Sequence, residues 1–183
     1  VDAYYYTGQY DNFIGRTLVA RQVSPQQTQI YSIVENAATM SASGGGNVKI
    51  DPIEVKTSGY GLGLDYRLNS GLSVFANYFH DELGNVPADF VAGFNTPDHR
   101  INFGAGHSGF GKNKRMVFNV TGRWQTDFLW EADFATGTVP SFFTMDAMIG
   151  YRFPAIGSLV KLGATNVLNK YYMNGFGNPQ IGG

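Results

Sequence analysis

Cysteine is absent from this chain of 183 residues, so a disulfide framework, a thiolate metal site and a cysteine nucleophile are excluded for it. Charged residues are scarce, at 15% of the chain, where average proteins have about 25%. Lysine and arginine number 13 against 14 aspartates and glutamates. This balance offers no clustered positive charge to neutralise phosphates, so nucleic acid is not expected as a partner.

Long hydrophobic runs are also missing. A membrane-spanning helix needs about 20 mostly apolar residues, and the longest apolar run, glycines included, has about six, at Gly59–Leu64. The start of the chain, Val1–Tyr6, lacks the cationic and apolar segments of a leader peptide. Because the chain has no initial methionine and opens within a predicted strand, we expect a fragment or a processed chain.

Aromatic residues and glycines are what the chain has in abundance, and they follow a period of two. Over Gly59–Leu68, leucines and tyrosines alternate with glycine, Asp65 and Arg67 for ten residues without exception. This alternation predicts a β-strand. After a short turn the pattern resumes over Leu72–Phe79, which predicts an antiparallel hairpin.

The same pattern recurs along the chain, and no segment is convincingly helical. Further predicted strands lie at Arg100–Gly106, Arg115–Gln125, Phe143–Phe153 and Ser158–Asn166, with a first strand near Asp2–Arg16 and another candidate at Gln29–Asn36. The connections at 69–71, 110–113 and 154–157 are tight, whereas those at 17–55, 83–97 and 127–140 are long and polar or rich in glycine, including Gly44–Gly46. Short turns at one end and long loops at the other are typical of a transmembrane β-barrel.

Alternation alone does not say which face meets water. In a soluble sheet the apolar face packs on a core, whereas in a membrane barrel it meets lipid and the polar face lines the lumen. Aromatic residues near the predicted strand ends favour the membrane interpretation over a soluble sandwich, because tyrosine and tryptophan prefer the membrane interface. They include Tyr4–Tyr6, Tyr10, Phe13, Trp124, Phe128, Trp130, Phe142, Phe143, Tyr171 and Tyr172.

Several segments resemble TonB-dependent outer-membrane receptors. Val139–Pro154 resembles the penultimate hairpin of these receptors, and Leu162–Tyr172 with Phe176–Gly183 resembles their C-terminal region. The most specific piece is the run G-x-x-N-hydrophobic-x-N-K-x-Y, from Gly163 to Tyr172. Upstream segments that are also similar to the family are Asp2–Tyr6, Tyr10–Ile14, Ser58–Leu62 and Phe94–Asn102.

The resemblance implies an all-β fold, an antiparallel up-and-down transmembrane β-barrel, of which residues 1–183 would form about seven or eight strands of roughly 22. The family's plug domain, most upstream strands and the last strand are not recognised in the sequence. We therefore expect the chain to be the C-terminal part of such a barrel. A small complete outer-membrane barrel with a structural or adhesin role stays open as the alternative.

The resemblance further implies the bacterial outer membrane and energy-coupled import of a scarce, bulky nutrient: a ferric siderophore, cobalamin, a glycan or a peptide. The implied partners are outer-membrane lipid, the extracellular ligand and a periplasmic TonB-type energy transducer that engages the family's N-terminal region. An enzymatic activity is not expected. The three histidines are scattered and Ser108 lacks a nucleophile elbow, so no catalytic residue, metal site or cofactor is predicted.

Two groups of residues are candidates for the function. The alternation predicts a first group that faces the lumen: Asp65, Arg67, Asn119, Arg123, Asp146 and Arg152. Binding residues concentrate on loops held by a rigid scaffold, which predicts a second group of ligand contacts in an extracellular loop: Asp127, Trp130, Glu131, Asp133 and Phe134. For both groups simple solvation is the competing interpretation.

Overall fold

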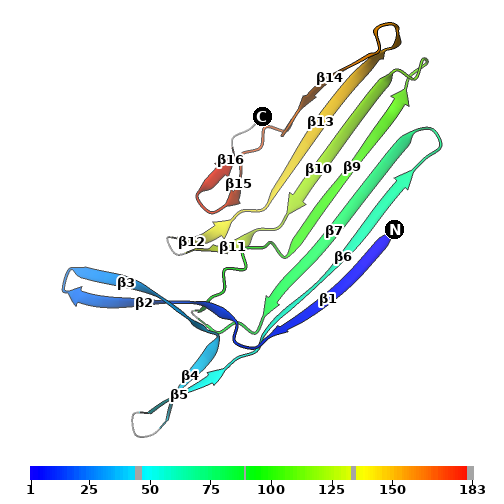
Figure 1. The fold of residues 1–183 in the computed structure, drawn as a ribbon. Helices are drawn as coiled ribbons and strands as arrows, with labels where there is room; N and C mark the ends of the chain where they lie inside the picture. The colour runs from blue at the N-terminus through cyan, green and yellow to red at the C-terminus, as the bar shows by residue number, and fades with distance from the viewer. Residues whose placement is uncertain (44–46, 89, 133–134, 181–183) are drawn as a thin grey trace.

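The computed structural model describes residues 1–43, 47–88, 90–132 and 135–180, and the side chains of 18 and 39–50 are also outside the description (Figure 1). Gly44–Gly46 lies outside the described residues. The described chain is almost entirely β-strand, and its single helical element is the 3-10 turn η1 (Pro154–Ile156). Among these residues no helix has the length and apolarity needed to cross a membrane.

The main sheet has seven antiparallel strands in the order β1-β6-β7-β9-β10-β13-β14. These are β1 (Asp2–Tyr10), β6 (Val55–Arg67), β7 (Leu72–Gly84), β9 (His99–Phe110), β10 (Met116–Gln125), β13 (Phe142–Phe153) and β14 (Ser158–Ala164). In the described structure β1 and β14 lie at opposite edges of the sheet and do not pair with each other (Figure 1). The sheet is therefore open, as expected of part of a larger barrel, and the alternative of a small closed barrel is not supported.

The three predicted tight turns are confirmed and lie at one end of the sheet (Figure 1). Between β6 and β7 the amide of Gly71 donates to the carbonyl of Leu68 at 3.0 Å. Gly71 has φ +95°, a left-handed conformation that glycine adopts without strain. Between β9 and β10 the amide of Lys114 donates to Gly111 at 3.0 Å, and between β13 and β14 η1 ends at Gly157.

The long connections and the segment after β14 lie at the other end and carry further strands. These are β2 (Ile14–Ser24), β3 (Gln27–Asn36), β4 (Ala38–Ser43), β5 (Asn47–Pro52), β8 (Phe90–Val91), β11 (Phe128–Glu131), β12 (Thr136–Val139), β15 (Tyr172–Gly175) and β16 (Asn178–Gln180). They form the hairpins β2–β3, β4–β5, β11–β12 and β15–β16. The predicted division into tight turns and long loops is thus confirmed.

Two boundaries were predicted wrongly. The expected strand near Asp2–Arg16 is two elements, because Asn12 takes a left-handed φ of 61° and turns the chain between β1 and β2. The expected long loop at 17–55 is the two hairpins β2–β3 and β4–β5. β2 and β3 contain several β-branched residues, which favour strands. The many polar residues among them give this segment the composition of a loop. The candidate strand Gln29–Asn36 is confirmed as most of β3.

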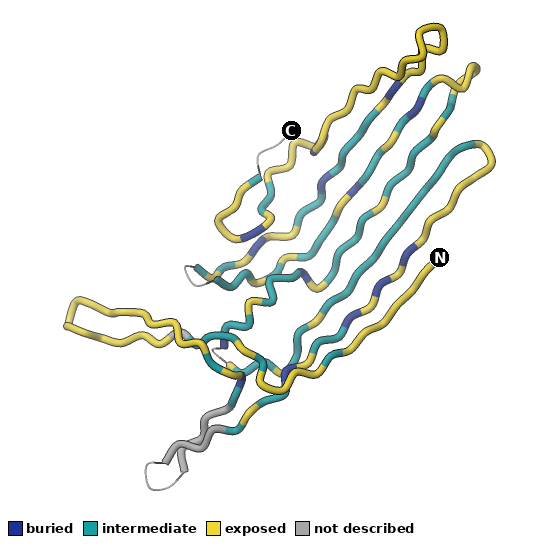
Figure 2. Tube along the Cα trace, viewed as in Figure 1, coloured by how far each residue is buried: buried dark blue, intermediate teal, exposed yellow. Residues whose placement is uncertain are grey.

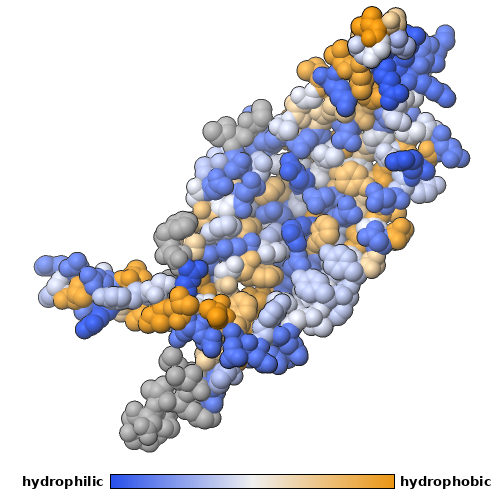
Figure 3. Space-filling model, in the orientation of Figure 1, coloured by the Kyte–Doolittle hydropathy of each residue, from blue (hydrophilic) through white to orange (hydrophobic). Residues whose placement is uncertain are grey.

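A small hydrophobic core fixes these hairpins to the sheet. Ala37, Val55 and Phe90 are buried and are packed by Phe13 and Leu83. Figure 2 shows buried segments at the junction of the hairpins with the sheet, and Figure 3 shows hydrophobic residues where the β2–β3 hairpin begins. The amide of Ala37 also donates to the carbonyl of Phe13 at 2.8 Å. The loops therefore start from a packed base.

Aromatic side chains cover glycines on neighbouring strands. In the register of β1 and β6, Tyr4 lies opposite Gly61 and Tyr6 lies opposite Gly59. A Cβ atom at Gly59 would come within 2.6 Å of the Tyr6 ring, and one at Gly61 would overlap the Tyr4 ring. The glycines of β6 therefore make room for the tyrosine rings of β1.

Candidate functional site

The strand register gives the main sheet one apolar and one polar face. On the apolar face Leu64 of β6 lies opposite Ala76 of β7, which lies opposite Phe103 of β9. Many large side chains on this face are exposed and others are half-buried, with Leu62 at 53% and Leu162 at 75% relative exposure. A sheet that presents its apolar face outward has no internal core beneath it, so another apolar medium must cover that face.

All six residues predicted to face a lumen lie on the opposite, polar face. Asp65 pairs with Phe75, Phe75 with Gly104, Gly104 with Thr121, and Thr121 with Asp146. The other members fall on the same face by alternation along β6, β10 and β13: Arg67, Asn119, Arg123 and Arg152. These residues therefore share one face of the sheet, along which they are spread from Arg67 and Arg152 at the turn end to Arg123 near the loop end of β10.

Within this group the structure brings Arg123 and Asp146 together. A guanidinium nitrogen of Arg123 donates to Oδ2 of Asp146 at 3.0 Å. The other carboxylate oxygen, Oδ1, accepts the backbone amide of Asn166 at 2.8 Å. Asp146 is therefore held from two sides, by a neighbouring strand and by the segment that follows β14.

The sequence run from Gly163 to Tyr172 forms a turn built on Asn166. Asn166 is 6% exposed and has a left-handed φ of 49°. Its side-chain amide donates to the carbonyl of Lys170 at 2.8 Å, and its side-chain oxygen accepts the amide of Lys170 at 3.0 Å. Asparagine suits this position because it tolerates the left-handed region and supplies both a donor and an acceptor.

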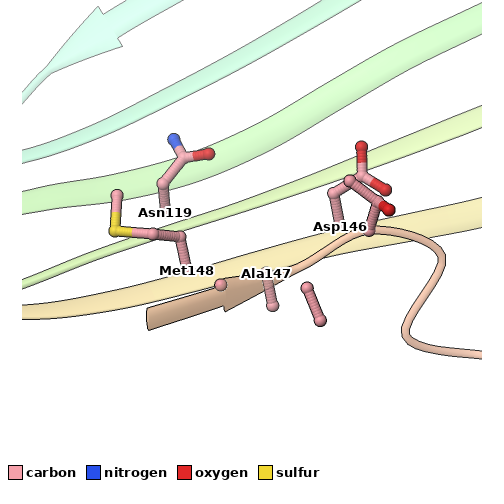
Figure 4. Close-up of a pocket in the computed structure, with 7 residues that line it drawn as sticks. Asn119, Asp146, Ala147 and Met148 are labelled. Carbon is pink, nitrogen blue, oxygen red and sulfur yellow. The ribbon is translucent and has the colours of Figure 1, made fainter. Parts of the chain in front are cut away.

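A shallow pocket of about 500 Å³ opens beside this turn. Figure 4 shows the side chains of Asn119, Met148 and Asp146 on one side of the sheet and Ala147 on the other. The pocket lies where β14 ends, since the pairing of β14 with β13 stops at the pair of Ala164 with Ala147. It combines one carboxylate with apolar walls and contains no catalytic arrangement.

A second pocket, of about 460 Å³, lies among the long loops. Its lining includes the four carboxylates of Glu82, Asp98, Asp127 and Glu131, and no lysine or arginine among the described residues. Two of the predicted loop contacts, Asp127 and Glu131, therefore line one pocket, which sequence reasoning did not connect to the 85–98 loop.

The two loops that form this pocket are joined by hydrogen bonds. The side-chain amide of Asn95 donates to the carbonyl of Glu131 at 2.9 Å, and the amide of Glu131 donates to the side-chain oxygen of Asn95 at 2.7 Å. The carboxylate of Glu131 accepts the amide of Gly93 at 3.0 Å. The position of Asp127 is thereby fixed, while its own side chain is exposed.

The other predicted loop contacts behave differently. The Trp130 ring packs over Gly175 of the β15–β16 hairpin, where a Cβ would lie 3.1 Å from the indole. Its indole nitrogen is buried without a hydrogen-bond partner among the described residues. Trp130 therefore joins two hairpins in this structure and does not line the loop pocket. Asp133 and Phe134 lie outside the described residues.

Sequence reasoning missed a cluster on the polar face near the loops. The hydroxyl of Tyr6 donates to Oδ1 of Asp81 at 2.6 Å, and the guanidinium of Arg100 binds Oδ2 of the same carboxylate. The Arg100 guanidinium also lies 5.6 Å from the ring centre of Phe79. Asp81 lies in β7 and Arg100 in β9, and only the register of these two strands brings the residues together.

In the described part of the chain no three histidine, cysteine, aspartate or glutamate side chains gather at one point. The arrangement is thus that of a surface with charged and hydrogen-bonding groups on one face, apolar groups on the other, and an acidic pocket among the loops.

Comparison with solved structures shows the same fold in outer-membrane receptors. The pyoverdine receptor FpvA of Pseudomonas aeruginosa PAO1, bound to pyoverdine, matches 98% of the chain with 15% identity and a TM-score of 0.62. The FpvAI–pyocin S2 complex matches 98% with 17% identity and a TM-score of 0.58. The copper transporter OprC matches 98% with 14% identity and a TM-score of 0.58.

The chain spans only about a quarter of these structures, namely 25%, 24% and 27% of their lengths. Comparison with curated protein sequences found no match. A family model described as "TonB dependent receptor-like, beta-barrel" matches residues 1–169, which is most of the chain. The chain therefore belongs to the TonB-dependent receptor family, as part of its β-barrel.

Proposed function

We propose that this chain is the C-terminal part of the barrel of an outer-membrane receptor that imports a scarce, bulky nutrient by binding and gated passage, without bond chemistry. The observation that carries the proposal is the contrast between the two faces of the main sheet, which is clearest on β6, β9, β10 and β13: one face is mostly apolar and the other carries most of the charged and hydrogen-bonding side chains. A transmembrane barrel requires this arrangement, because lipid covers one side and the lumen lies on the other.

The dimensions of the apolar face support a membrane position. On β13 the apolar face runs from Phe143 to Phe153. These ten steps correspond to roughly 33 Å along the strand and, with a tilt of 40–45°, to about 25 Å across the membrane, the height of a barrel's apolar band. Aromatic rings stand at both ends of the band, with Trp124 beside Phe143 at the loop end and Tyr151 beside Phe153 at the turn end.

For the polar face we propose a lumen position. The buried members of the main sheet support it, because most of them lie on this face, including Gly61, Val117, Thr144 and Gly150. Side chains crowd together on the concave side of a curved sheet and spread apart on the convex side. In this position Arg123, Asp146 and Arg100 would line the passage or contact a plug.

For ligand capture we propose the acidic loop pocket. Its four carboxylates, with no cationic side chain in its described lining, favour a ligand that presents positive charge or several hydrogen-bond donors. Asp127 is the strongest candidate for a direct contact, because its side chain is exposed while its loop is held by the Asn95–Glu131 hydrogen bonds.

Two partners follow from membership of the family. Outer-membrane lipid would cover the apolar face, and a periplasmic TonB-type transducer would supply the energy for import. Two relatives give examples of the class of nutrient: FpvA has been solved bound to pyoverdine, and OprC is a copper transporter. We therefore propose a metal-bearing nutrient such as a ferric siderophore as the first class to test, with cobalamin, glycans and peptides after it.

The test is growth of the source bacterium with and without the full-length protein. Cells are starved of iron and then supplied with a panel of ferric siderophores, cobalamin or copper salts, with and without the energy transducer. The proposal predicts at least one nutrient whose use requires both proteins. Growth that is the same in all strains on every nutrient, combined with a leaky or poorly adhesive envelope in the deletion strain, would favour a structural role.

The loop pocket is tested with the nutrient found in that assay. Asp127→Asn should weaken binding of that nutrient to whole cells by about tenfold, the effect of one lost charge-assisted hydrogen bond. The matched control is Glu35→Gln, which also removes one carboxylate from a loop strand but lies outside the pocket. Equal binding by both variants and the wild type would remove the pocket from ligand capture.

A further inference from the structure

Two of the three histidines, which are 19 positions apart in the sequence, form a direct cross-strand pair. His80 of β7 lies opposite His99 of β9 in the register. Their Nδ1 atoms are 3.2 Å apart, and their ring centres are 4.7 Å apart with planes at 25°. Both side chains are half-buried on the apolar face, near its loop end. The spacing of the two histidines along the chain does not predict this pair, because the contact depends on the register of β7 and β9.

Two further oxygen atoms lie at the same place. The hydroxyl of Tyr78 is 2.8 Å from Nδ1 of His99, and the backbone carbonyl of Asp98 is 2.9 Å from Nδ1 of His80. Tyr60 borders the site on the other side, with its hydroxyl 3.5 Å from that of Tyr78 and 39% of its surface exposed. The site is therefore open to the outside of the sheet and combines two imidazole nitrogens with a phenol and a carbonyl oxygen.

We propose that His80 and His99 bind one divalent transition-metal ion, of the class of Zn²⁺, Cu²⁺ or Ni²⁺, on the outer surface of the barrel near the loops. Imidazole is a preferred ligand of these ions. Two nitrogens bound to one tetrahedral Zn²⁺ at about 2.0–2.1 Å are roughly 3.3 Å apart. The observed separation of 3.2 Å is close to that distance.

The hydrogen bonds show what the ion would replace. In this 3.2 Å contact one Nδ1 donates and the other accepts, because two hydrogens would point at each other. With His80 as the donor, its N–H also points to the carbonyl of Asp98, and Nδ1 of His99 accepts the hydroxyl of Tyr78. An ion bound to both Nδ1 atoms would take the place of this hydrogen, which would move to Nε2 of His80 because a neutral imidazole keeps one N–H. Because the rings are close to parallel, each must turn about its Cβ–Cγ bond so that both lone pairs meet at the ion.

This inference rests on the strand register and is independent of which nutrient the receptor imports. His107 provides a matched control within the same face. It lies on β9 near the turn end, its Nδ1 accepts the amide of Gly109 at 3.0 Å, and its neighbours are the rings of Phe110 and Phe118. His107 lies opposite Leu72 and Phe118 in the register, so it has no second imidazole with which to chelate an ion.

The experiment uses the full-length protein extracted in detergent from the outer membrane, without an affinity tag. Titration with ZnCl2 and with CuSO4 is followed by calorimetry, and the Cu²⁺ complex is examined by electron paramagnetic resonance. The variants are His80→Phe and His99→Phe, which keep a ring in the aromatic surface, and the control is His107→Phe. Resistance of each barrel to cold SDS verifies that it is folded.

We expect the wild type and His107→Phe to bind the ion equally, with hyperfine coupling to two nitrogens in the Cu²⁺ spectrum. Either His80→Phe or His99→Phe should lower the affinity by at least about tenfold, as loss of a metal-supporting group does, and should remove the two-nitrogen coupling. Equal binding by all four folded proteins, or no binding by the wild type, would overturn the assignment.

Discussion

At the scale of single residues, contacts between rings and glycines hold adjacent strands at close range. Phe75 of β7 lies opposite Gly104 of β9, and Tyr4 of β1 lies opposite Gly61 of β6. A glycine in a strand weakens the strand by itself, but a ring that covers it restores the packing. The arrangement explains why a chain with 24 glycines nevertheless forms long regular strands.

Replacing Gly104 tests this packing. In Gly104→Ala the new Cβ would lie 2.6 Å from both the Phe75 ring and the carbonyl oxygen of Val120, and the backbone atom cannot swing aside. We expect the full-length protein to lose about 1–3 kcal/mol in its free energy of unfolding, measured by urea titration of the folded barrel.

The control for this substitution is Gly84→Ala, at the loop end of β7, where the nearest atom to a new Cβ is 4.0 Å away. It should change the free energy of unfolding by less than about 0.5 kcal/mol. Equal effects of the two substitutions would contradict the packing explanation.

At the scale of elements, the turn after β14 is the part of the chain in which sequence pattern and structure agree most closely. Asn166 and Asn169 both have left-handed φ values, of 49° and 48°. Only Asn166 uses its side chain, in two hydrogen bonds with Lys170. This turn also directs the backbone amide of Asn166 to the carboxylate of Asp146, so a hydrogen bond joins the end of the sheet to the polar face.

The two asparagines separate the side-chain contribution from the backbone contribution. Asn166→Ala removes two hydrogen bonds and strains the left-handed backbone, so we expect it to destabilise the turn by about 2–4 kcal/mol. Asn169→Ala carries only the backbone strain and should destabilise it by about 1–2 kcal/mol. Hydrogen–deuterium exchange of the amides of Lys170 and Asn166 measures the difference. Equal exchange rates in the two variants would show that the side-chain bonds do not stabilise the turn.

The strands and tight turns of the main sheet could be predicted because residues close together in the sequence determine them. Alternation over ten residues at Gly59–Leu68 and a turn glycine at Gly71 specify a hairpin without reference to the rest of the chain. The same alternation placed Arg123 and Asp146 on one face, and the register then brought them into contact. By contrast, the hairpins β2–β3 and β4–β5 depend on the packed base around Phe90, which lies far along the sequence.

The parts of the site that were missed depend on register between distant strands. Asp81 and Arg100 are 19 positions apart, as are His80 and His99, and both contacts exist only because β7 and β9 are adjacent with one particular alignment. Likewise, the loop pocket needs the 85–98 loop against β11. The alternation in a single sequence indicates which face of a strand a residue occupies. It does not identify the residue that lies opposite on the next strand.

At the scale of the whole molecule, the central claim is that lipid covers the apolar face of the main sheet and that the polar face lines the lumen. The open edges of the described sheet, on β1 and β14, agree with this claim only within a larger barrel, because unpaired backbone groups are not tolerated in lipid. The relatives, of which the chain covers about a quarter, have the length that such a barrel needs.

The most direct test uses the lack of cysteine in this chain. Single cysteines are placed in the full-length protein, made free of other cysteines, at Leu62, Ile149 and Leu162 on the apolar face and at Asn119, Thr121 and Lys161 on the polar face. Each cysteine carries a nitroxide spin label in reconstituted bilayers. We expect the first three labels to collide mainly with oxygen, which dissolves in lipid, and the last three to be shielded from it or to collide mainly with a water-soluble nickel chelate. The opposite pattern, or accessibility that does not alternate between the two faces, would contradict the claim.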